Sequence, residues 1–200
     1  PDNLNQILVA YNDSRGSAAT PGNISGASYS TDGGTTFTRI TAASGQSPFA
    51  GTEGDPVALY HKPTQTWLTV WLDTACGGQG LGGYKTTTPA VAASWTHFCV
   101  FNESSADRES GWADNTVGHT HFGRLYISWN DFAVGSGALF VTYSDNVGVT
   151  WHAPVLVSTP GLIRDVQITG DSANGNLYLA GMDGGGGGFP HNEHNTQYRP

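Results

Sequence analysis

The 200-residue sequence has few cysteines, few lysines and no long apolar segment. Two residues are cysteine, two are lysine, and the formal net charge is −8 at pH 7. A chain this acidic lacks the basic surface that nucleic acid or an anionic membrane requires, so we expect neither as a partner. No apolar run is long enough to span a membrane as a helix, and none shows the helical period. The sequence therefore predicts no membrane span and no helical domain.

The two cysteines, Cys76 and Cys99, lie within one stretch of the sequence, and a disulfide between them is the favoured interpretation. Two buried thiols are the alternative. Glycine, serine, threonine and asparagine are abundant while lysine is scarce, a composition typical of exported β-proteins. We therefore expect a secreted or cell-surface protein.

A short phrase occurs twice, at Tyr29–Phe37 and at Tyr143–Trp151. Both copies read Tyr-Ser-x-Asp/Asn-x-Gly-x-Thr-aromatic. A degenerate copy runs from Tyr84 to Trp95, and a further copy begins at Tyr198. Repetition at this spacing is typical of a fold that is built from equivalent structural units.

Apolar runs that end in aspartate accompany the repeated phrase. The closing residues lie at intervals of 60, 58 and 52 and are Asp13, Asp73, Asp131 and Asp183. A second series precedes the last three of these by 17 or 18 residues and consists of Asp55, Asp114 and Asp165. Aspartates that recur in equivalent places more often tie strand ends to turns than do chemistry, so we interpret both series as structural.

Each unit contains about four runs rich in Tyr, Trp, Val, Ile and Thr, separated by Gly, Asn, Asp and Pro. Four short strands in 50–60 residues are typical of a propeller blade. We predict an all-β fold, a β-propeller of four-stranded antiparallel blades, with about three to three and a half blades present. The predicted blades are 1–46 without its first strand, 47–103, 104–158, and 159–200 as the first half of a fourth. A complete ring of six or seven blades would take the rest from the same longer chain or from a second copy.

The repeated phrase resembles the Asp-box, or BNR, repeat of the sialidase-like β-propeller superfamily. The resemblance depends on Ser30, Asp32, Gly34 and Phe37 in one copy and Ser144, Asn146, Gly148 and Trp151 in the other. An acidic or amide side chain can accept backbone N–H bonds within such a turn, and glycine adopts a positive φ easily. We therefore expect these residues to stabilise hairpins rather than to react. The superfamily includes sialidases, other glycoside-processing enzymes and lectins, so the resemblance implies a fold more than an activity.

Polar and aromatic residues outside the repeat are better candidates for a ligand site. The candidates are Arg15, Glu53, Arg108, Glu109, Trp112, Arg164, His191 and His194. Sialidase-like enzymes hold a substrate carboxylate with arginines, and Arg164 lies about where such an arginine would. Ordinary surface ion pairing is the alternative for Arg15 and Arg164. Trp112 could stack on a sugar from the loop that leads into a first strand, or pack beneath that loop.

Two histidine pairs, His119 with His121 and His191 with His194, suggest a metal site but match no zinc signature. We interpret the first pair as two residues on one face of a strand at a hairpin. The glycine run at 184–188 lacks the residues of a phosphate-binding loop. We therefore predict no metal site and no cofactor, with calcium as the one ion that the aspartate-rich rim could coordinate.

The sequence favours a module that binds a carbohydrate or a protein surface, because no complete catalytic set is visible. One alternative is a segment of a sialidase-like glycoside hydrolase, in which further residues complete the arginine cluster and supply the acid and nucleophile. The other alternative is a structural surface or filament-assembly module. Whether the protein is an enzyme is left open by the sequence.

Overall fold

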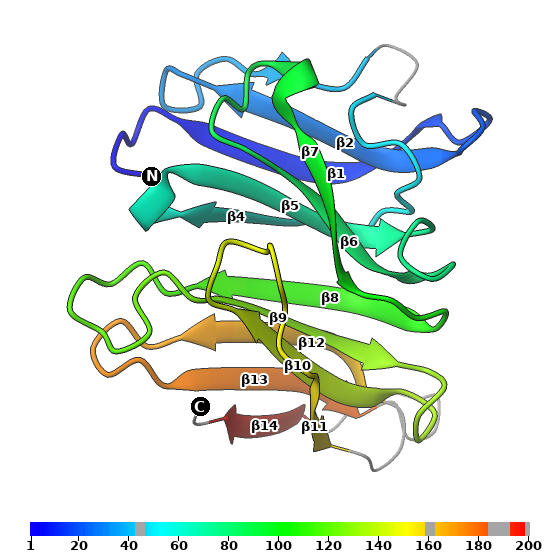
Figure 1. Cartoon of the computed structure of the whole chain (residues 1–200), viewed down its shortest axis with the longest axis vertical. Helices are drawn as coiled ribbons and strands as arrows, with labels where there is room; N and C mark the ends of the chain where they lie inside the picture. The colour runs from blue at the N-terminus through cyan, green and yellow to red at the C-terminus, as the bar shows by residue number, and fades with distance from the viewer. Residues whose placement is uncertain (43–46, 159–162, 184–192, 199–200) are drawn as a thin grey trace. The chain divides into compact units, whose positions relative to one another are not determined.

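The computed structural model describes residues 1–42, 47–158, 163–183 and 193–198 (Figure 1). The chain divides into two compact units, Pro1–Ser104 and Ser105–Pro200. The regular secondary structure of the described residues is β-strand apart from two short 3-10 helices, Lys62–Thr64 and Ala92–Ser94. Among these residues there is no helix of the length and apolar character needed to cross a membrane.

The first unit contains two antiparallel sheets in which consecutive strands are neighbours. Its three-stranded sheet consists of β1 (Ile7–Gly16), β2 (Asn23–Ser30) and β3 (Thr38–Arg39). Its four-stranded sheet consists of β4 (Val57–His61), β5 (Thr66–Asp73), β6 (Gly80–Thr86) and β7 (Thr96–Phe101).

The second unit has the same plan. Its four-stranded sheet consists of β8 (Ala106–Ala113), β9 (Leu125–Asp131), β10 (Ala138–Ser144) and β11 (Val155–Ser158). Its three-stranded sheet consists of β12 (Ile163–Gly170), β13 (Leu177–Asp183) and β14 (Glu193–Tyr198). The first strands of the two sheets, β8 and β12, lie next to each other (Figure 1).

The predicted fold class is confirmed: the chain is all-β, and its antiparallel four-stranded meanders are blades of a β-propeller. The Asn174-Gly175 turn joins β12 to β13, with Gly175 at a φ of 73°. The last sheet contains three strands where a half blade would contain two. A total of six or seven blades stays a prediction.

The two copies of the repeated phrase form hairpin turns with matching hydrogen bonds. In the first turn the Ser30 hydroxyl donates to Asp32 Oδ1 over 2.7 Å and accepts from the Gly34 N–H over 3.0 Å. Asp32 also accepts from the backbone N–H of Thr36 over 2.9 Å and from its hydroxyl over 2.6 Å. These bonds, led by the one from the Thr36 hydroxyl, lower the pKa of Asp32 from its ordinary 3.8 to about 2.

The second turn replaces the carboxylate with an amide. The Ser144 hydroxyl donates to Asn146 Oδ1 over 3.0 Å and accepts from the Gly148 N–H over 2.9 Å. Asn146 Oδ1 accepts from the Thr150 N–H over 2.8 Å, while Asn146 Nδ2 donates to the Thr150 hydroxyl over 2.8 Å. Gly34 and Gly148 have φ values of 88° and 70°. A residue with a side chain would be strained in this backbone conformation, whereas glycine adopts it easily.

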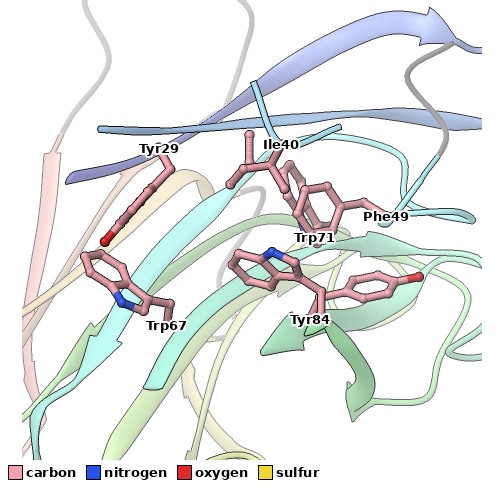
Figure 2. Close-up of a cluster of buried hydrophobic side chains, with 8 residues drawn as sticks. Tyr29, Ile40, Phe49, Trp67, Trp71 and Tyr84 are labelled. Atoms are coloured by element: carbon pink, nitrogen blue, oxygen red, sulfur yellow. The ribbon is translucent and has the colours of Figure 1, made fainter. Parts of the chain in front are cut away.

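An aromatic cluster joins the two sheets of the first unit (Figure 2). Phe49 lies at its centre, with its ring centroid 5.3 Å from those of Trp71, Tyr84 and Trp95. The corresponding cluster of the second unit is mainly aliphatic and consists of Tyr126, Leu139, Val141, Val166, Ile168, Leu177 and Leu179. The phrase-closing Phe37 is 46 % exposed, so it covers the first turn without entering the core.

Candidate functional site

The second unit contains two sheets, and the first strand of each sheet, β8 or β12, is interrupted by a β-bulge near its N-terminal end. The register of β8 against β9 shifts between Asp107 and Ser110, and that of β12 against β13 shifts between Arg164 and Gln167. Within these bulges Arg108 has a φ of 55° and Asp165 a φ of 50°. Such a backbone is unfavourable for residues with a side chain, and strain of this kind is concentrated at functional sites. The bulges therefore mark this end of β8 and β12 as a candidate site.

An ion pair links the two bulges. Arg108 Nη1 lies 3.4 Å from Asp165 Oδ1, and Arg108 Nε lies 4.0 Å from Asp107 Oδ2. The Arg108 and Asp165 side chains are 45 % and 41 % exposed, so solvent and ligands can reach both groups. Arg108 was predicted as a candidate ligand residue from the sequence, whereas its partner Asp165 was predicted to be structural.

The four-stranded sheet of the first unit has the same strained position just before its first strand, β4. Asp55, just before β4, has a φ of 53°. The Asn12 side chain holds it in place, because Asn12 Oδ1 accepts from the Asp55 N–H over 2.8 Å and Asn12 Nδ2 lies 3.3 Å from Asp55 Oδ1. Gly54 leaves room for this amide, since a Cβ there would come within 2.7 Å of Asn12 Oδ1.

The strand register shows that Asp55, Arg108 and Asp165 occupy equivalent positions. In each case the residue two positions later in the chain pairs with a residue on the next strand. That partner lies three positions before the aspartate that closes the next strand. The predicted member of this series in the second unit, Asp114, was wrong, because Arg108 occupies the equivalent position. Asp114 lies beyond the opposite end of β8, where its N–H donates to the Arg124 carbonyl over 2.9 Å. The connection between β8 and β9, residues 114–124, is longer than the connection between β12 and β13, residues 171–176, so counting residues back from the closing aspartate selects the wrong residue.

Three other candidates have clear positions. Arg15 lies on β1 with a side chain that is 59 % exposed, 3.8 Å from Asp13, whose carboxylate is also bound by Arg39. Glu53 is exposed in the loop before β4. Glu109 follows Arg108 in the bulge but is buried, with 7 % exposure. Of these, Glu109 is the one placed directly beside the strained pair.

Trp112 does not lie in the loop that leads into the first strand, as the sugar-stacking hypothesis required. It lies within β8, and its ring centroid is 5.8 Å from that of Tyr126. Gly170 makes room for it, because a Cβ at that position would come within 2.2 Å of the indole. Trp112 therefore packs between the two sheets of the second unit.

The side chains of Arg164 and His194, and the whole of His191, lie outside the described residues. The structure therefore leaves their proposed contacts with a ligand as predictions.

A polar cavity of about 440 Å³ lies at the opposite end of β8 and β12 from the bulges. Asp114, His119, His121 and Asn174 are among its lining residues. The two histidines lie in the loop between β8 and β9 and not on a strand, so the expectation of a shared strand face was wrong. His119 Nδ1 lies 3.2 Å from the buried carboxylate of Asp114, which also accepts from the Thr116 N–H over 3.1 Å. Asp114 thus orders this loop from within.

The sequence matches no protein-family model and no curated protein. Solved structures share its fold. An α-L-arabinofuranosidase from Fusarium graminearum, in complex with an iminosugar inhibitor, is 12 % identical, with a TM-score of 0.66 over 98 % of this chain and 55 % of that one. A GH43_12 protein from a capybara gut metagenome is 18 % identical, with a TM-score of 0.63 over 97 % of this chain and 37 % of that one.

An exo-β-1,3-galactanase from Phanerochaete chrysosporium, bound to β-1,3-galactotriose, is 15 % identical, with a TM-score of 0.59 over 97 % of this chain and 47 % of that one. The chain thus spans about half the length of the structures it resembles. At these identities the likeness concerns the fold alone, which is a β-propeller similar to those of glycoside hydrolases.

Proposed function

We propose that this protein is a β-propeller module that binds carbohydrate at the bulged ends of its first strands. The observation that carries the proposal is the ion pair between two residues with strained backbones on neighbouring strands. Arg108 Nη1 lies 3.4 Å from Asp165 Oδ1. A guanidinium and a carboxylate together offer donors and acceptors in fixed planes, an arrangement that suits adjacent hydroxyl groups of a sugar. Asp107 adds a second carboxylate beside the same guanidinium.

The similar folds support a carbohydrate ligand, because the compared structures include a galactanase bound to a trisaccharide and an arabinofuranosidase bound to an iminosugar. The matching hydrogen bonds of the two hairpin turns support membership of the sialidase-like Asp-box group. The Cys76–Cys99 disulfide supports secretion or cell-surface display, since disulfides persist in oxidising compartments. We retain the blade boundaries 1–46, 47–103, 104–158 and 159–200 as part of this proposal.

A glycoside hydrolase is the second candidate. Hydrolysis of a glycosidic bond requires two carboxyl groups, one of them able to donate a proton. Asp165 and the buried Glu109 both lie on the bulged strands and are the two carboxyl groups considered for these roles. We retain binding without cleavage as the proposal, because the described residues do not show an acid and a nucleophile placed on either side of one bound sugar.

The experiment measures the affinity of the 200-residue chain for β-1,3-galactotriose and for arabino-oligosaccharides by isothermal titration calorimetry. Arg108→Ala and Asp165→Asn should each weaken binding at least about tenfold, the loss expected when one charge-assisted hydrogen bond of about 1.5–3 kcal/mol is removed. Lys62→Ala, which removes an exposed cation paired with Asp2, is the matched control and should leave the affinity unchanged.

Unchanged affinity in both site variants would refute the proposed site. Release of reducing sugar from the same oligosaccharides, abolished by Glu109→Gln, would establish the hydrolase instead. Thermal unfolding of each variant separates loss of the site from loss of the fold.

A further inference from the structure

The residues around the disulfide form a cluster of metal-binding groups that the carbohydrate site does not use. Cys76, in the loop after β5, is bonded to Cys99 in β7. The donor atoms of Cys76, His97 and Cys99 all lie within 4.8 Å of one another. The distance from Cys76 Sγ to His97 Nε2 is 3.9 Å. Three groups of the kind that bind zinc therefore already converge at one point.

A fourth group, the carboxylate of Asp73, lies beside two members of this cluster, His97 and Cys76. Asp73 is fully buried, and its Oδ2 lies 2.8 Å from His97 Nε2. Its other oxygen accepts from the Ala75 N–H over 2.8 Å, which fixes the direction of the carboxylate.

Gly82 provides the space between these groups. A Cβ on this residue would lie 2.4 Å from Asp73 Oδ2 and 2.7 Å from Cys76 Sγ. The carboxylate and the sulfur therefore point into a volume that any larger residue at Gly82 would fill.

We propose that reduction of the disulfide converts this cluster into a zinc site with Cys76, Cys99, His97 and Asp73 as ligands. A reductant, either a dithiol or a phosphine, supplies two electrons, the S–S bond breaks, and each sulfur gains a proton to become a thiol. On binding Zn²⁺ both thiols lose their protons to solvent and bind as thiolates, and the imidazole binds through a nitrogen lone pair. Two sulfurs, one nitrogen and one carboxylate oxygen make a four-coordinate set that suits Zn²⁺.

The consequence is that the four-stranded sheet of the first unit has two alternative cross-links. In the oxidised protein a covalent bond joins the loop after β5 to β7. In the reduced protein a zinc ion would join the same two segments and add the end of β5 through Asp73. His97 is 34 % exposed on its side chain, which gives the ion a route from solvent.

The test compares oxidised chain with chain reduced by a phosphine, which does not compete strongly for zinc. After gel filtration, zinc content is measured by atomic emission, and Co²⁺ is added separately as a spectroscopic probe. We expect about one zinc per reduced chain and none per oxidised chain. The Co²⁺ complex should show thiolate charge-transfer absorption together with the intense visible bands of a tetrahedral site.

Variants identify the ligands. His97→Ala and Cys76→Ser should abolish stoichiometric zinc binding by the reduced protein, whereas His119→Ala, a histidine beside a buried aspartate in the other unit, should retain it. Asp73→Asn should weaken zinc binding by at least the 10–100-fold that is typical of losing a group from the outer shell of a site.

Alkylation of the reduced wild type with N-ethylmaleimide tests the thiols without any substitution and should block zinc uptake. Zinc binding by the oxidised protein that equals binding by the reduced protein, or full retention by His97→Ala, would overturn the proposal. These outcomes are independent of carbohydrate binding, because the ligands of the cluster and the residues of the proposed carbohydrate site are different residues, and the zinc assays use no sugar.

Discussion

In the first unit the cluster between the two sheets is aromatic, whereas in the second unit it is mostly aliphatic. The hairpin turns of the two units also differ at one equivalent position, which is a carboxylate at Asp32 in the first turn and a neutral amide at Asn146 in the second. Both units nevertheless form antiparallel meanders, and both turns make the same serine-centred hydrogen bonds. The fold therefore depends on an apolar contact of sufficient volume and on an oxygen acceptor in the turn, and not on which residue provides them.

The largest expected difference between the units concerns their cores. Phe49→Ala should lower the free energy of unfolding by about 3–5 kcal/mol, because the cavity would leave three aromatic rings without their common partner. Leu179→Ala in the second unit should cost about 2–5 kcal/mol, with the smaller values expected if aliphatic neighbours close over the gap.

Urea denaturation measures both variants, with Leu4→Ala as a control at a side chain that is 84 % exposed, which should shift stability by no more than about 0.5 kcal/mol. A Phe49→Ala cost well below that of Leu179→Ala would contradict the central role of the phenylalanine ring.

The serine variants test whether the two turns are equivalent. Ser30→Ala and Ser144→Ala should each cost about 1–3 kcal/mol, because both buried hydroxyls satisfy a glycine N–H that would otherwise lose its partner. The two costs should agree within about 0.5 kcal/mol, since the bonds correspond one to one. Thermal unfolding of both variants gives the comparison, and a loss at only one turn would show that the turns differ in their contribution to stability.

The smallest expected effect concerns the single charge that distinguishes the turns. The pKa of Asp32 is depressed to about 2 in the folded protein, from an ordinary value of 3.8. A depressed carboxyl pKa favours folding above pH 4, and this contribution is lost as the pH falls from about 4 to about 2. Asp32→Asn should therefore flatten the acid dependence of stability in that range, and Asn146→Asp should steepen it.

Urea midpoints of the wild type and the two variants, measured at intervals between pH 2 and pH 5, check this result. The contribution is small because Asp32 is exposed and water screens its charge. An unchanged pH profile in both variants would show that the turn bonds do not distinguish the ionised form.

Much of the fold could be predicted from the sequence because its signals are local. The Asn174-Gly175 turn follows from the backbone that glycine alone adopts without strain, and the strands follow from β-branched and aromatic runs between turn residues. Candidate sites were harder to predict. Trp112 was expected in a loop and lies in a strand, because residue counting assumed loops of equal length and the loop between β8 and β9 is longer than the loop between β12 and β13.

By itself the sequence determined the repeated antiparallel hairpins and the residues that hold their turns, because each of these depends on hydrogen bonds between residues within a few positions of each other. Only the tertiary structure decided that Arg108 takes the place of an aspartate beside Asp165, that His97 and the two cysteines converge, and that Asp73 lies against His97. These arrangements depend on strand register and on bulges, which are set by packing between segments that are distant in the chain.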